Sequence, residues 1–192
     1  MSRTASTMLP LGTPLPDFEL PRPDGTTWST SSIADPPGVL VMFICNHCPF
    51  VVHIGRELGL LTQRWAARGL EVVGINSNDT EAYPADAPDK MGPTARSFGW
   101  DFPYLVDADG AVATAFRAAC TPDFYLFGSD GALAYRGRFD GARPGTDTPV
   151  TGQDLRAAVN AVFDGIPAPT EQLPSMGCNI KWAPGREPEW FG

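Results

Sequence analysis

Two cysteines separated by two residues, Cys45 and Cys48, are the side chains of this 192-residue chain best suited to chemistry. Thiols at this spacing can close into a small disulfide ring, so the pair can take up and release two electrons by thiol–disulfide exchange. His47 lies between them, and a protonated imidazole beside a thiolate stabilises its negative charge. We therefore expect dithiol chemistry, with His47 favouring the reduced form and an oxidising potential.

The residues around this pair predict a strand followed by a helix. Residues 39–44 are a continuous apolar run bounded by turn residues, which is typical of a strand covered on both faces. From about residue 46 to residue 68, apolar residues recur every three or four positions, as in a helix with one buried face. Because a helix N-terminus stabilises negative charge, we expect Cys45 to be the exposed, attacking thiolate and Cys48 the resolving thiol.

The remaining segments predict an α/β core. An Asp-Gly turn at 24–25 indicates an N-terminal β-hairpin, and a second apolar strand at 70–76 implies a right-handed parallel crossover. A Gly-rich turn at 128–131 joins two apolar runs into an antiparallel hairpin. The last helix has a capping-box pair, Thr151 and Asp154, at its predicted start.

Length and composition limit the function further. The chain suits one domain, 1–192, with residues 1–15 and 167–192 as extended termini. The net charge of −8 and the lack of a basic run argue against nucleic acid as a partner. No segment has the length and apolar character of a membrane span or a signal peptide, so we expect a cytoplasmic protein without a membrane partner. Without a phosphate-binding loop, we expect no bound cofactor.

The order of these elements, with Thr121 and Pro122 opening the second hairpin, resembles the thioredoxin fold. The N-terminal hairpin resembles that of the redoxin branch, the peroxiredoxin-like family related to alkyl hydroperoxide reductases and thiol-specific antioxidants. An uncharacterised group within this branch has blocks similar to residues 43–49, 74–79, 120–123, 149–152 and 177–182. The resemblance implies a central mixed β-sheet flanked by helices, an N-terminal β-hairpin and an irregular C-terminal tail.

The same resemblance implies that a cis-proline, here Pro122 after Thr121, faces the dithiol and shapes the groove for a substrate backbone. Peroxiredoxins place their peroxide-reducing cysteine in a Pro-x-x-x-Thr-x-x-Cys pattern. With Cys48 in that position, Val41 and Cys45 replace the Pro and the Thr. We therefore expect peroxide reduction to be the weaker activity. Residues 39–44 also supply no carboxylate to move protons.

Two further cysteines have open roles. Cys120 is expected near the groove, either as a redox partner or as a small buried apolar residue. Cys178, in the C-terminal tail, is either a second resolving thiol or unreactive.

The leading hypothesis is a thiol–disulfide oxidoreductase, with weak thiol-dependent peroxide reduction of an antioxidant kind. Its partners would be a disulfide or peroxide substrate and an external thiol reductant of the thioredoxin or glutathione type. The alternative is a metal-binding or redox-sensing module using Cys45, Cys48 and His53 or Cys178, although a closed zinc site needs four ligands. A third hypothesis is a structural redoxin module with inert thiols.

Overall fold

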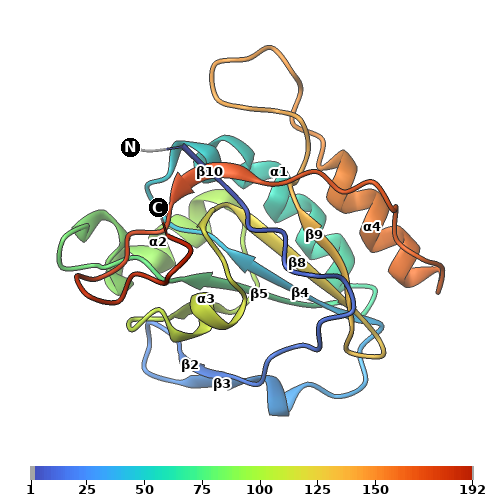
Figure 1. Ribbon diagram of the computed structural model, residues 1–192, viewed down its shortest axis with the longest axis horizontal. Helices are drawn as coiled ribbons and strands as arrows, with labels where there is room; N and C mark the ends of the chain where they lie inside the picture. Colours follow the sequence, from blue (N-terminus) through green and yellow to red (C-terminus); the bar gives the residue numbers. More distant parts are fainter. Residues whose placement is uncertain (1–2, 192) are drawn as a thin grey trace.

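The computed structural model describes residues 3–191 and is built around a five-stranded sheet with strand order β6-β5-β4-β8-β9 (Figure 1). Strand β4 pairs in parallel with β5 and antiparallel with β8, so the sheet is mixed. The parallel pairing expected of the crossover is therefore confirmed, and so is the second hairpin, in which β8 pairs antiparallel with β9. The strands are β4 (Gly38–Phe43), β5 (Glu71–Asn76), β6 (Tyr104–Val106), β8 (Asp123–Gly128) and β9 (Leu133–Gly137).

Strand β4 lies at the centre, and its residues alternate between two apolar layers. Leu40 and Met42 pack in the layer that contains the inner faces of two long helices, α1 and α4. Val41 and Phe43 pack in the opposite layer, against a short helix, α3, and the N-terminal hairpin. This burial on both faces explains why the sequence of β4 is an unbroken apolar run. The helices are α1 (Pro49–Ala66), α2 (Pro88–Phe98), α3 (Ala111–Ala115), α4 (Gln153–Phe163) and the 3₁₀ helices η1 (Thr30–Ser32) and η2 (Pro84–Asp86).

Two predicted helix starts are wrong. Helix α1 begins at Pro49, with Cys48 as its N-cap, rather than near residue 46. Proline suits the first helical position because its φ is already helical and no N–H is needed there. Helix α4 has Gly152 as its N-cap, without a side-chain cap. The N–H groups of Thr151 and Gly152 instead donate to the Asp140 carboxylate, each at 2.7 Å.

A second, small sheet joins the two ends of the chain to the core (Figure 1). Strand β10 lies between β1 and β7, antiparallel to both, so the C-terminal tail that was expected to be irregular contains one strand. The N-terminal hairpin, β2 with β3, is as predicted. None of the helices in residues 3–191 is long and apolar enough to cross a lipid bilayer. These strands are β1 (Arg3–Ala5), β10 (Met176–Asn179), β7 (Cys120–Thr121), β2 (Glu19–Pro21) and β3 (Thr27–Ser29).

Candidate active site

The two cysteines lie between the end of β4 and the start of α1, facing the segment that leads into β8. The peptide bond between Thr121 and Pro122 is cis, as the resemblance implied. Cys45 Sγ is 3.5 Å from Thr121 Oγ1, and the Cys48 thiol donates to the Thr121 carbonyl oxygen at 3.2 Å. Thr121 therefore contacts both sulfur atoms, Cys45 Sγ through its side chain and Cys48 Sγ through its backbone carbonyl oxygen.

Both sulfur-bearing residues are buried, which corrects the expectation that Cys45 is exposed. Cys45 is 1% exposed and Cys48 is 0% exposed. The cause is that Thr121 packs against both side chains and the half-buried Asn46 and His47 form the outer turn.

The charge on the pair also differs from the prediction. A hydrogen bond from the Cys45 thiol, together with one from Cys178 and one from the Val51 backbone N–H, lowers the pKa of Cys48 to about 5. The pKa of Cys45 is raised well above its usual value by its bond with Cys48, by burial and by the nearby Asp86 carboxylate. The directions of the two shifts thus favour the thiolate at Cys48 and the protonated thiol at Cys45.

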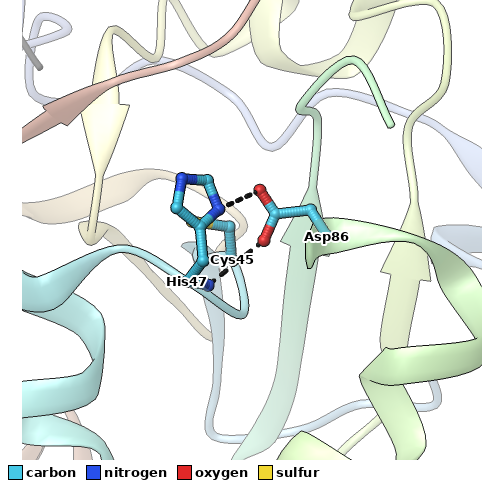
Figure 2. A group of neighbouring side chains, drawn as sticks. All are labelled: Cys45, His47 and Asp86. Atoms are coloured by element: carbon cyan, nitrogen blue, oxygen red, sulfur yellow. Dashed lines mark hydrogen bonds and ion pairs between the residues drawn. The ribbon is translucent and has the colours of Figure 1, made fainter. Parts of the chain in front are cut away.

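A buried carboxylate, Asp86 in η2, holds the turn between the two cysteines (Figure 2). It accepts hydrogen bonds from the backbone N–H of Asn46 at 2.8 Å and from that of His47 at 3.2 Å. Its second oxygen lies 2.6 Å from Nδ1 of the His47 ring, and Asn78 Nδ2 donates to that oxygen at 2.7 Å. The imidazole of His47 is therefore hydrogen-bonded to Asp86. The effect of His47 on the redox potential of the cysteine pair stays a prediction.

More residues support this turn from outside. The Tyr83 ring stacks on His47 with centroids 6.1 Å apart, and Lys181 Nζ lies 5.7 Å from the centre of the Tyr83 ring. The Tyr104 hydroxyl donates to Asn46 Oδ1 at 3.1 Å. Sequence reasoning missed these contributions as well as that of Asp86, because none of these residues lies in a chemically recognisable pattern.

The remaining candidate thiols lie close to the pair. Cys120 is fully buried, its Sγ is 3.8 Å from the Pro122 carbonyl oxygen, and burial raises its pKa well above the usual value. Cys178 is paired with Thr121 in the strand register of β10 and β7. Burial, with a hydrogen bond to Cys48, raises the pKa of Cys178 to about 12. The structure thus brings four thiols to one region.

The potential metal ligands differ from those predicted. Among the described residues, the His, Cys and carboxylate atoms that gather are those of Cys45, His47 and Asp86, all within 4.8 Å of one another. Of the ligands predicted from the sequence, Cys45 belongs to this group, whereas Cys48, His53 and Cys178 do not. The ligand set proposed from the sequence is therefore corrected.

A buried carboxylate does lie near the thiols, but it comes from β8 rather than from residues 39–44. Asp123 follows the cis-proline, is 0% exposed and accepts a hydrogen bond from the Tyr125 hydroxyl at 2.9 Å. Burial raises the pKa of Asp123 to about 7, and its charge contributes to the raised pKa of Cys120. This group can gain or lose a proton near neutral pH.

The surface beside the cis-proline is hollowed. A shallow depression, with room for little more than one water molecule, is lined by Pro122, Phe50, Ile54, Arg138 and Arg143. Arg138 is paired with Asp154 on α4. This depression gives an approach to the segment that covers the sulfur atoms.

A mixed sheet, a dithiol ahead of α1 and a facing cis-proline define a redoxin with the thioredoxin-like fold. Comparison with known families agrees, because the model of the AhpC/TSA family matches residues 11–136. The chain belongs to the AhpC/TSA family. No curated protein matches the chain significantly.

Solved structures give the same fold. A hypothetical protein of Sinorhizobium meliloti 1021 is 48% identical, with a TM-score of 0.92, and the match covers 95% of this chain and 100% of that one. An uncharacterized conserved protein of Geobacillus kaustophilus is 45% identical, with a TM-score of 0.92 over 96% of this chain and 98% of that one. A secreted Mycobacterium tuberculosis disulfide oxidoreductase is 21% identical, with a TM-score of 0.55 over 75% of this chain and 95% of that one.

Proposed function

We propose that this protein is a thiol–disulfide oxidoreductase that works through Cys45 and Cys48. The observation that supports this most strongly is the state of the pair: one thiol and one thiolate of pKa about 5, both in contact with Thr121 beside a cis-proline. Membership of the AhpC/TSA family and the fold shared with a disulfide oxidoreductase agree with a thiol redox function.

The charge distribution assigns the attack to Cys48 and the resolving step to Cys45. The Cys48 thiolate attacks one sulfur of a substrate disulfide, forms a mixed disulfide and releases the other half as a thiolate. Cys45 then attacks Cys48 Sγ, the Cys45–Cys48 bond forms, and the Cys45 proton leaves with the second substrate thiol. Two electrons pass from the pair to the substrate, and an external thiol of the thioredoxin or glutathione type returns them.

Thr121 and Pro122 act as positioning residues in this proposal. The Thr121 hydroxyl is 3.5 Å from the resolving sulfur, and a hydrogen bond from the Thr121 side chain also favours the Cys48 thiolate, so this side chain helps to position both sulfur atoms. His47 and Asp86 hold the turn that joins them.

A peroxide can enter the same cycle as a weaker substrate. Attack by the Cys48 thiolate on a peroxide oxygen gives a sulfenic acid and releases water or an alcohol once a proton is taken up. The Cys45 thiol condenses with the sulfenic acid, loses a second water and forms the same disulfide. The reaction is expected to be slow because Val41 and Cys45 stand where peroxiredoxins have Pro and Thr.

Trapping of the mixed disulfide tests the proposal. In Cys45→Ser/Cys178→Ser, where both thiols in contact with Cys48 are replaced, glutathione disulfide should leave a stable adduct on Cys48, seen by intact mass and peptide mapping. Cys48→Ser/Cys178→Ser, the matched variant, should form an adduct on Cys45 at least tenfold more slowly at pH 7, because burial and the Asp86 carboxylate still raise the pKa of Cys45 after its bond with Cys48 is lost. Equal rates would contradict the assigned roles, a faster adduct on Cys45 would reverse them, and no adduct in either variant would contradict the function.

A metal site is the second candidate, supported by the cluster of Cys45, His47 and Asp86. A thiolate, an imidazole and a carboxylate are three ligands that zinc accepts, and a catalytic zinc site keeps its fourth position open. Zinc that co-purifies at one equivalent and is lost in both Cys45→Ser and Asp86→Asn would favour this candidate. Zinc that stays below a tenth of an equivalent would exclude it.

A further inference from the structure

The chain covers its own dithiol with the strand β10. Strand β7 is the two-residue strand that leads into the cis-proline, and β10 pairs with it in antiparallel register, Cys178 with Thr121 and Asn179 with Cys120. In Figure 1, β10 also lies next to α1, and these two elements are in contact. Because β10 already pairs with β7, an extended peptide cannot add a strand to this edge while β10 stays in place.

The close approach of β10 depends on glycine. A Cβ built on Gly177 would lie 2.0 Å from the Thr121 carbonyl oxygen and 3.2 Å from the Pro122 nitrogen. No other residue fits at that distance from backbone atoms without displacing the strand. Gly177 therefore lets the next residue, Cys178, reach the level of the dithiol.

Three sulfur atoms meet at this point. Thr121 contacts Cys45 and Cys48 through its side chain and its carbonyl oxygen, and its strand partner is Cys178. The three cysteines belong to one buried apolar cluster, and Cys178 is 4% exposed. Cys48 is hydrogen-bonded to both of the other thiols, so it is the central sulfur of the three. Burial raises the pKa of Cys178 to about 12, and the charge of Lys181, three residues later, opposes this shift only in part.

We propose that Cys178 is a third redox thiol, which takes over the disulfide from Cys45–Cys48 to form Cys48–Cys178. The proposal rests on the proposed function, since a Cys45–Cys48 disulfide must form first. Cys178 attacks Cys48 Sγ, the Cys48–Cys178 bond forms, the Cys45–Cys48 bond breaks, and the proton of Cys178 passes to Cys45. The exchange conserves electrons and requires no external oxidant.

This exchange makes the attachment of β10 to the rest of the protein depend on the redox state of the three cysteines. In the Cys45–Cys48 form, β10 is held by its backbone pairing with β1 and β7. In the Cys48–Cys178 form it is also tied covalently to α1, and Cys45 is again a free thiol in the turn held by Asp86. The substrate-facing edge is then closed until a reductant opens the new bond.

Disulfide mapping in Cys45→Ser tests whether Cys178 forms a disulfide with Cys48 when the Cys45–Cys48 disulfide cannot form. Trypsin places the three remaining cysteines in separate peptides: Cys48 in one that ends at Arg56, Cys120 between Arg117 and Arg136, and Cys178 between Arg156 and Lys181. After one equivalent of glutathione disulfide, most molecules should lose two thiols and yield the Cys48 peptide linked to the Cys178 peptide. In Cys45→Ser/Cys178→Ser, the glutathione adduct on Cys48 should persist at least tenfold longer.

The wild-type protein gives the second measurement. Oxidised with one equivalent of oxidant and quenched with acid, it should contain the Cys48–Cys178 linkage beside Cys45–Cys48, and Cys178→Ser should contain only the latter. A lasting adduct on Cys48 in Cys45→Ser, or a link from Cys48 to Cys120, would overturn the proposal while leaving the Cys45–Cys48 chemistry intact. Absence of any disulfide in the wild-type protein would instead overturn the proposed function.

Discussion

Thr121 makes the two cysteines act as one acid–base unit. Its contacts hold Cys45 Sγ and Cys48 Sγ close enough for a hydrogen bond, and that bond is the largest cause of both pKa shifts. Loss of the proton from one sulfur therefore changes the pKa of the other. In the proposed reaction the nucleophile forms before the substrate arrives, since a thiolate of pKa about 5 is ionised at neutral pH.

This coupling can be measured by replacing the donor. Cys45→Ala removes the hydrogen bond to Cys48, so the pKa of Cys48 should rise by about one to two units, the value of a hydrogen bond to a charged group. Cys45→Ser keeps an O–H donor and should shift the pKa less. The pH dependence of thiolate absorbance, or of the alkylation rate by a small reagent, gives both values. Identical pKa values in wild type and Cys45→Ala would contradict the coupling.

The sequence predicted the reactive residues only where they belong to a recognisable motif. The spacing of Cys45 and Cys48 predicted a dithiol, and Thr121-Pro122 was placed opposite it through the family resemblance. Asp86 was not predictable, because it reaches the turn across 39 residues of chain from a 3₁₀ helix without a pattern. The prediction also put the negative charge on Cys45, whereas hydrogen bonds from Cys45, Cys178 and the Val51 backbone lower the pKa of Cys48 instead, and these contacts could not be read from the sequence.

The helices and the central strands could be predicted from the spacing of apolar residues, whereas the short strands could not. Strand β4 and helix α1 have apolar patterns long enough to read, whereas β7 has two residues and β10 has four. Such strands carry no period and are stable only through their partners. The arrangement of β1, β10 and β7 is therefore a tertiary property, and it decides what lies over the dithiol.

Gly177 gives a direct test of that arrangement. Gly177→Ala places a Cβ against the Thr121 carbonyl, so it should lower the free energy of unfolding by about 1–3 kcal/mol, as overpacking does. Gly92→Ala, inside α2 and facing only the flexible end of Arg96, is the matched control and should raise it by about 0.5–1 kcal/mol. Denaturant unfolding of the two variants measures the difference. Equal stabilities would mean that β10 does not depend on this close approach.

The complete fold places its two apolar layers on either side of one sheet, and the C-terminal segment contributes to both. Cys178 packs in the layer of α1 and α4, while Ile180 and Trp182 pack in the layer of α3 and the N-terminal hairpin. The tail is thus part of the core rather than an appendage. An acidic group is also enclosed in this core, because Asp123 is fully buried on the central sheet.

Enclosing Asp123 makes stability depend on pH. Its folded pKa of about 7 lies above the ordinary 3.8, so the folded protein binds more protons than the unfolded chain between these values, and stability is lost as pH rises through them. Asp123→Asn removes this dependence. From about pH 4 to about pH 8, its unfolding free energy relative to wild type should increase by up to about 4 kcal/mol.

Denaturant unfolding at a series of pH values supplies this measurement. Asp101→Asn, at an exposed position, is the control, and its difference from wild type should stay constant across the range. A constant difference for Asp123→Asn as well would show that the buried carboxyl titrates at the same pH in the folded and unfolded chains.

The burial of both sulfur atoms has a kinetic consequence. A reagent too large to enter must wait for local opening of the turn or of β10, so its observed rate is the intrinsic rate multiplied by the open fraction. Each 1.4 kcal/mol of opening free energy lowers that rate about tenfold. Small oxidants and bulky protein disulfides therefore meet different barriers at the same sulfur, and the flexibility of the covering segments acts as a filter on substrate size.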